Sequence, residues 1–185
     1  MFFLKNPEYK FLALFIPLII LWFFFYHYLY KIDDFLSLEF DFLITFSQFL
    51  SKQSNYLLSL LNFQTSIEIN GDMVITKILN YPYNHGVWIG EPCNGIKVFG
   101  VFSIFVLAFK GKIQNKLWFI PTGILILHFI NVIRVSTLTY ISAVNPFILD
   151  FNHNITFQLI VYFSMIILWY WWITKFSLIK NENSN

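Results

Sequence analysis

The chain alternates long runs of apolar residues with polar stretches, and four of the runs have about the length needed to cross a membrane. A transmembrane helix needs about 20 predominantly apolar residues. Tyr and Trp gather at several ends of the runs, as in the aromatic belts of membrane helices. The pattern predicts an all-α integral membrane protein with about four transmembrane helices, which cover residues 11–30, 93–109, 117–140 and 155–174.

The segment 35–62 is also apolar with a helical period, but polar and charged residues interrupt it. These residues are Glu39, Asp41, Gln48, Lys52, Gln53 and Asn55. Because charged side chains are costly at the centre of a bilayer, we predict an external amphipathic helix that lies on the membrane surface. A fifth transmembrane helix is the alternative interpretation.

Residues 63–92 follow a different pattern, with apolar and polar residues alternating around Asn70-Gly71. Such a dipeptide between alternating residues is the strongest local signal for a two-residue hairpin turn. We predict a small β-hairpin, with 87–89 as a third short strand. The whole chain, 1–185, is predicted to form a single membrane-embedded domain, with an external region at 31–92 and a disordered polar tail at about 178–185.

Composition supports the membrane assignment, because 57% of the residues are hydrophobic and only 12% are charged. A soluble domain usually carries about 25% charged residues. The net charge of +2 is too small to indicate a nucleic-acid partner. The single cysteine excludes an intramolecular disulfide framework and a cysteine-rich zinc site. No pattern predicts a metal site, a cofactor or an oligomeric state.

The distribution of charge predicts the orientation of the helices. With four spans and a cytoplasmic N-terminus, the outer segments hold eight of the ten acidic residues. The cytoplasmic segments hold most of the lysines, which are Lys5, Lys10, Lys110, Lys112, Lys116, Lys175 and Lys180. This asymmetry obeys the positive-inside rule and favours four spans over five, with both termini cytoplasmic.

The single cysteine, Cys93, opens the second apolar run from the outer side. Pro92 precedes it, and Pro is favoured at the first position of a helix. We therefore expect the thiol in a first helical turn, where the helix dipole favours the nucleophilic thiolate form. Lys97, four residues later, is expected on the same helix face and adds positive charge, whereas Glu91 opposes it.

Three further polar residues are expected near the same outer face. Arg134 and Asn131 lie late in the third span, where an arginine is costly unless it is paired or functional. Asn131 lies one turn deeper and is expected to hold the guanidinium. His153 precedes the fourth span, and its imidazole suits general acid–base chemistry. Thiolate, imidazole and guanidinium together provide what cysteine acyl transfer requires.

Each of these residues also has a structural interpretation. Cys93 can be a packing residue, Arg134 a snorkelling anchor and His153 a solvated side chain. The chain would then be a non-catalytic membrane scaffold or assembly partner. A small anion transporter that uses Arg134 and His128 is a third possibility, although we expect His128 to make a hydrogen bond between helices.

The motifs EPCNGIKVFGVFSIFVLAFKG, NVIRVSTL and FNHN together resemble the exosortase and archaeosortase superfamily, and the compact exosortase F type in particular. Members carry a Cys-(Ser/Asn)-Gly-Ile motif, an Asn-x-x-Arg motif and a distal His at these positions. The resemblance covers roughly residues 60–170. It implies that Cys93, Arg134 and His153 are catalytic, with Asn94 standing where many members have Ser.

The family consists of membrane cysteine proteases or transpeptidases. The resemblance therefore implies a multi-pass enzyme of the bacterial inner membrane with an active site that faces the periplasm. Its substrates would be exported proteins with a C-terminal sorting signal, which is a short motif followed by a hydrophobic span and a basic tail. Cys93 would form a thioester with the substrate, which then passes to water or to a surface lipid or glycan acceptor in or on the membrane.

Overall fold

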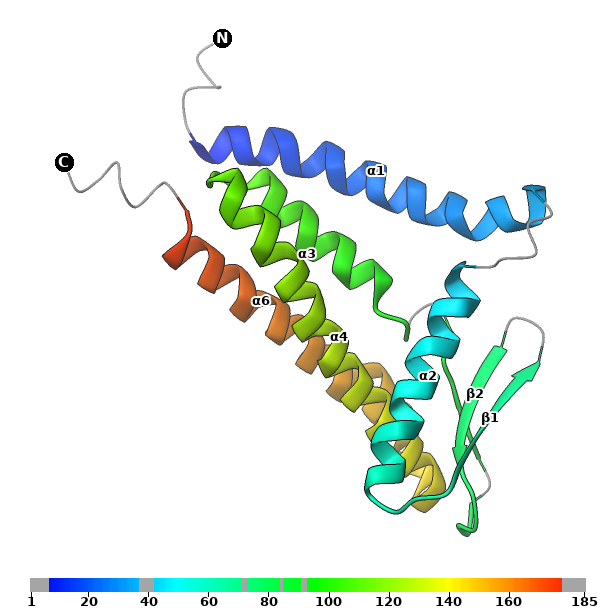
Figure 1. Ribbon diagram of the computed structural model, residues 1–185. Helices are drawn as coiled ribbons and strands as arrows, with labels where there is room; N and C mark the ends of the chain where they lie inside the picture. Colours follow the sequence, from blue (N-terminus) through cyan, green and yellow to red (C-terminus); the bar gives the residue numbers. More distant parts are fainter. Residues whose placement is uncertain (1–6, 37–41, 71–72, 84, 91–92, 178–185) are drawn as a thin grey trace. The chain divides into compact units, whose positions relative to one another are not determined.

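The computed structural model describes residues 7–36, 42–70, 73–83, 85–90 and 93–177 (Figure 1). These residues divide into two compact units. The first unit contains the described residues up to Phe35, Lys97–Leu127 and those from Phe163 onward. The second unit contains the described residues of Leu36–Ile96 and His128–Tyr162. The predicted tail lies outside the described residues, and the single-domain assignment stays a prediction.

The fold class is confirmed as that of a mostly helical membrane protein. Within the described ranges, three helical segments are long and apolar enough to span a bilayer: Tyr9–Tyr28, Ile113–Val144 and Pro146–Lys175. The first two belong to the helices α1 (Pro7–Leu36) and α4 (Ile113–Val144), and the third combines α6 (Phe157–Lys175) with the short helical segments that precede it. Many of their large apolar side chains are exposed, as expected for surfaces that face lipid.

The predicted span at 93–109 differs from the structure. Helix α3 is Ile96–Ala108, so it begins three residues after Cys93 and has 13 residues. At 1.5 Å per residue it is about 20 Å long, which is less than the roughly 30 Å hydrocarbon core of a bilayer. The apolar run was read as one helix from its first residue, but the backbone turns at Cys93–Gly95 before the helix starts.

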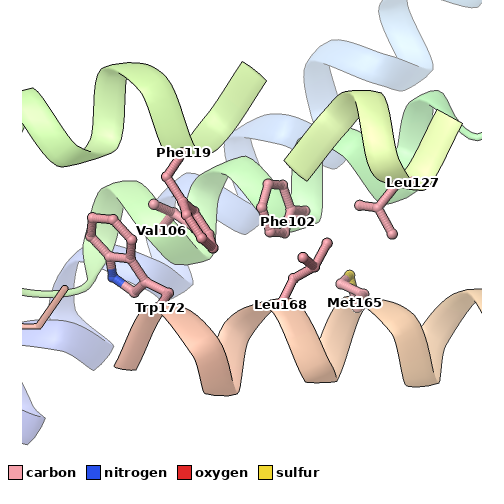
Figure 2. Close-up of a cluster of buried hydrophobic side chains, with 7 residues drawn as sticks. All are labelled: Phe102, Val106, Phe119, Leu127, Met165, Leu168 and Trp172. Atoms are coloured by element: carbon pink, nitrogen blue, oxygen red, sulfur yellow. The ribbon is translucent and has the colours of Figure 1, made fainter. Parts of the chain in front are cut away.

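The first unit has its own hydrophobic core, which aromatic side chains dominate. Figure 2 shows the cluster, in which Phe102 and Val106 of α3 meet residues of α4 and α6. The remaining members are Phe119, Leu127, Met165, Leu168 and Trp172. Gly100 of α3 lies so close to the Trp22 ring of α1 that an added Cβ would overlap it at 2.0 Å. Glycine therefore permits the close packing of α1 on α3.

The second unit is built on a three-stranded antiparallel sheet in the order β1-β2-β3. Its strands are β1 (Thr65–Asn70), β2 (Met73–Ile78) and β3 (Val87–Trp88). The predicted hairpin and third strand are thus confirmed. Asn70 pairs directly with Met73, so the hairpin connection falls at 71–72, outside the described residues.

Helix α2 (Phe42–Leu60) covers this sheet and is the predicted amphipathic helix, although it is shorter than the segment 35–62 (Figure 1). It is not among the described helices that are long and apolar enough to span a membrane. Its buried residues form one stripe, Leu43, Ser47, Leu50, Ser51, Ser54 and Leu58. The hydroxyl of Ser51 bonds that of Thr76 in β2, and Ser54 Oγ lies 2.9 Å from Ser136 Oγ of α4. Small polar residues therefore fix α2 against the sheet and α4.

After α4, the chain continues through three short helical segments into α6. A 3₁₀ helix (η2, Pro146–Ile148) leads into α5 (Leu149–Phe151), and a π-helix (η3, Asn152–Thr156) follows. π-Helical turns are rare and frequently occur at functional sites, because the wider turn re-aims side chains. Here the π-helix carries His153.

Candidate active site

Cys93 lies in a tight turn that joins β3 to α3. The backbone N–H groups of Cys93 and Asn94 both donate to the carbonyl of Gly90, at 2.9 and 3.1 Å. Asn94 Oδ1 accepts from the N–H of Ile96 at 3.0 Å, an arrangement that favours a turn over helix. Gly95 has φ 85°, which glycine adopts without strain. The prediction that Cys93 lies in the first turn of a helix is therefore wrong, and Glu91 and Pro92 are outside the described residues.

The thiol is buried within the second unit. Cys93 is 2% exposed and packs among apolar side chains of α2, α4 and the end of the sheet, which are Leu50, Ile89, Val132 and Val135. This environment excludes water from the sulfur. Polar groups that contact the sulfur there act in a medium of low dielectric constant, where their interactions are stronger than in water.

His153 lies directly against the sulfur. Its Nε2 is 2.8 Å from Cys93 Sγ, and its Nδ1 is 3.0 Å from Asn154 Oδ1. An amide oxygen can only accept, so Nδ1 carries the proton in this arrangement. In the neutral ring, Nε2 is then the unprotonated nitrogen and can accept the proton of the thiol. The three side chains form a Cys–His–Asn series, an arrangement known from cysteine proteases.

Arg134 reaches the same sulfur from α4. Its Nη2 donates to Cys93 Sγ at 3.9 Å, although the residue is only 5% exposed. A buried guanidinium is stabilised by an anionic partner, and a thiolate would provide one. The structure therefore brings together the thiol, the imidazole and the guanidinium that the sequence singled out, all within the second unit.

Asn131 makes a different contact from the one expected. Its Nδ2 donates to the backbone carbonyl of Cys93 at 2.8 Å, so it holds the backbone of Cys93 rather than the guanidinium of Arg134. Both residues lie on α4, where Asn131 is 2% exposed. A sequence pattern places two residues on one helix face but does not identify the group that each one contacts.

Three residues that adjoin or contact Cys93 each have a buried polar atom with no hydrogen-bond partner within the described ranges. These atoms are the donors Asn94 Nδ2 and Arg134 Nε and the acceptor Asn131 Oδ1. Buried polar atoms are nearly always satisfied in folded proteins, so each exception calls for an explanation. Because all three residues adjoin or contact Cys93, these atoms are candidates for binding a ligand there.

Two other residues from the sequence analysis make contacts with other partners. Lys97 belongs to the first unit, and its Nζ lies 5.0 Å from the centre of the Tyr26 ring in a cation–π contact. Because Cys93 precedes the helix, the expected i, i+4 relation between Cys93 and Lys97 does not exist. His128 Nε2 lies 2.6 Å from Gln53 Oε1, which confirms the expected hydrogen bond between helices, here α4 and α2.

Asn154 is the residue at this site that sequence reasoning missed. The stretch FNHN carried a signal, because an amide next to a histidine can accept from its ring. The sequence does not reveal the π-helical backbone of η3. On that backbone, Asn154 Oδ1 contacts Nδ1 of the His153 ring, while Nε2 of the same ring contacts the sulfur of Cys93.

The chain was compared with known protein families, curated proteins and solved structures. The family model described as transmembrane exosortase (Exosortase_EpsH) matches residues 8–172, which is most of the chain and includes every residue of the site. No curated protein and no solved structure matches the chain.

Proposed function

Because the chain belongs to the transmembrane exosortase family, whose members have a membrane transpeptidase or protease type of role, we propose that it is a cysteine transpeptidase with Cys93 as nucleophile. Its substrates would be exported proteins that carry a C-terminal sorting signal. The enzyme would cleave that signal through a thioester on Cys93 and pass the protein to a surface acceptor. The FNHN motif further suggests the compact exosortase F type.

The observation that carries this proposal is the 2.8 Å contact between Cys93 Sγ and His153 Nε2. A nucleophile and a base within hydrogen-bond reach, with a third group that orients the base, form the signature of an activated nucleophile. Asn154 supplies the third group. A purely structural cysteine requires none of these polar partners, which argues against the scaffold interpretation.

In the first half of the reaction, His153 Nε2 takes the proton of the thiol as Sγ attacks the scissile carbonyl carbon. The new C–S bond forms, and the carbonyl electron pair moves onto oxygen, next to the guanidinium of Arg134. When the intermediate collapses, the C–N bond breaks and the departing amine takes the proton from His153. The product is a thioester between Cys93 and the new carboxyl end of the substrate.

In the second half, an acceptor attacks the thioester while His153 removes its proton. The C–S bond then breaks, and the sulfur recovers the proton from His153. Water as acceptor would release a free protein, whereas an amine or hydroxyl of a lipid or glycan would anchor it. The buried surroundings of Cys93 disfavour water at the thioester, so we favour transfer over hydrolysis.

The proposal includes a location. The positive-inside distribution of lysines supports cytoplasmic termini, which would direct the turn at Cys93 toward the periplasmic side of the bacterial inner membrane. Helix α2 would then lie at the outer membrane surface, and the chain would act as one membrane-embedded domain. Cysteine-scanning with a membrane-impermeant thiol reagent would test this orientation, because the Cys93→Ala chain contains no other thiol.

The decisive experiment is to trap the thioester. Co-expression with a tagged exported protein that ends in a motif, a hydrophobic span and a basic tail should yield a covalent adduct that hydroxylamine releases. Cys93→Ala should abolish both the adduct and the processing of the substrate. Since Cys93 is the only cysteine, an adduct of this kind can form nowhere else.

A matched control separates the position of the thiol from its presence. The double variant Cys93→Ala/Ser59→Cys keeps one thiol in the same unit, at an exposed position of α2. It should form no adduct and process nothing. If Cys93→Ala instead processes the substrate as the unaltered chain does, the enzyme proposal is wrong and the scaffold interpretation replaces it.

A further inference from the structure

The two backbone N–H groups nearest the thiol, those of Cys93 and Asn94, are already engaged in hydrogen bonds. Enzymes of acyl transfer commonly use backbone N–H groups at and beside the nucleophile for this purpose. Here the N–H groups of Cys93 and Asn94 both already donate to the carbonyl of Gly90, at 2.9 and 3.1 Å. Side chains beside the thiol are therefore the alternative source of donors for the charge on the substrate oxygen.

Asn94, the chain neighbour of Cys93, and Arg134, which contacts its sulfur, each have a buried donor that is unmatched among the described residues. Asn94 Nδ2 and Arg134 Nε have no hydrogen-bond partner there, and the two residues are 0% and 5% exposed. Water does not reach such groups to compensate them, so each destabilises the empty site. An acceptor that arrives with the substrate would satisfy both.

Asn94 is also fixed in place before any substrate binds. Its Oδ1 accepts from the N–H of Ile96 at 3.0 Å, and the rigid amide plane then fixes Nδ2 as well. The positive φ of Gly95, 85°, sets the turn that makes this bond possible. Donors that need no reorganisation during the reaction are the ones that stabilise a transition state most.

We propose that Asn94 Nδ2 and Arg134 Nε together form an oxyanion hole built from side chains, which binds the carbonyl oxygen of the scissile peptide group as it becomes tetrahedral. This inference rests on the proposed function and extends it, because it assigns a catalytic role to Asn94 in place of the backbone amides. Arg134 contributes charge, and Asn94 contributes a neutral donor beside the nucleophile.

The test compares two reactions of Cys93 that differ in their need for an oxyanion hole. A short N-acetylated peptide aldehyde adds to the thiol to give a tetrahedral hemithioacetal, whose oxygen requires the donors. Iodoacetamide alkylates the same thiol by displacement of iodide, without an oxyanion. Cys93 is the only thiol, so both probes report on this site alone in the full-length, membrane-reconstituted chain.

Two variants change the donor while they keep the turn. Asn94→Asp retains the oxygen that accepts from Ile96 but has no N–H, whereas Asn94→Ser retains a hydroxyl that can both donate and accept. We expect Asn94→Asp to weaken aldehyde binding about 100-fold, in line with the loss of one oxyanion-hole donor. Its alkylation rate should fall far less, and Asn94→Ser should recover much of the aldehyde binding.

The inference is overturned if Asn94→Asp binds the aldehyde as tightly as the unaltered chain. It is equally overturned if aldehyde binding and alkylation fall by the same factor, because Asn94 would then only shape the turn. Failure of the proposed function gives a different result, in which the unaltered chain forms no aldehyde adduct and Cys93→Ala still processes the substrate.

Discussion

Asn131 is the residue through which the positioning of Cys93, the proposed nucleophile, can be measured most directly. Its Nδ2 donates to the carbonyl of Cys93 at 2.8 Å, and both residues are 2% exposed. Replacing Asn131 with Asp keeps the shape of the side chain but removes the donor and leaves a buried carbonyl unsatisfied. Such a loss costs about 1–3 kcal/mol.

This free-energy cost can be converted into an expected decrease in kcat. If the turn at Cys93 shifts and the loss appears in the transition state, each 1.36 kcal/mol lowers the rate tenfold. Asn131→Asp should therefore reduce kcat for a span-bearing substrate by about 5-fold to 150-fold. KM should change little, because Asn131 acts on the nucleophile's backbone rather than on the substrate's hydrophobic span.

The assay follows processing of the tagged substrate by the reconstituted chain, together with thermal unfolding of each variant. Asn80→Asp is the matched control, because Asn80 makes an exposed bond to Gln64 Oε1 at 3.0 Å in the same unit. It should process at nearly the unaltered rate.

The reasoning is refuted if Asn131→Asp retains the unaltered kcat. It is also refuted if the variant loses activity only through a higher KM, because the residue would then bind the substrate rather than position Cys93. A lower melting temperature with unchanged kcat would assign Asn131 a purely structural role.

Three further variants test other contacts. Asn154→Ala removes the acceptor of the His153 Nδ1 proton and should slow processing roughly 5-fold, as expected for a bond of about 1 kcal/mol. Asn154→Asp still has an acceptor and should restore the rate. Equal rates for the two variants would contradict the role of Asn154 in orienting His153. Gly95→Ala places a Cβ at φ 85° and should lower the unfolding free energy by about 1–2 kcal/mol, measured by denaturation; an unchanged value would mean that the turn is not constrained. Ser51→Ala leaves the Thr76 hydroxyl buried and unpaired, which should lower the free energy of unfolding by about 1–3 kcal/mol. The double variant Ser51→Ala/Thr76→Val should recover most of that loss. Additive losses in the double variant would refute the pairing of the two hydroxyls.

Apolar length and alternation predicted the membrane helices and the hairpin, because those patterns reflect burial directly. The start of α3 was misplaced for a physical reason. Pro92 and the apolar run favoured helix from Cys93 onward, but the side chain of Asn94 competes for the N–H of Ile96, and Gly95 permits a positive φ. The Asn-Gly pair before the helix was the signal that a turn precedes it.

The convergence of Cys93, Arg134 and His153 was predictable because each residue lies at the same end of a separate element. Their individual contacts were not predictable. The choice of Asn131 between the guanidinium and the Cys93 carbonyl depends on a turn that lies 38 positions away in the sequence. The role of Asn154 depends on a π-helical backbone, which the pattern of apolar and polar residues does not predict.

The burial of the chain's only thiol has a consequence for its survival between reactions. In an oxidising compartment, an accessible thiolate is readily converted to sulfenic acid or captured in a mixed disulfide. A protein with one cysteine has no second thiol with which to resolve such damage. At 2% exposure, Cys93 is sheltered from bulky oxidants by its neighbours, so the same packing that confines its chemistry also preserves it while no substrate is bound.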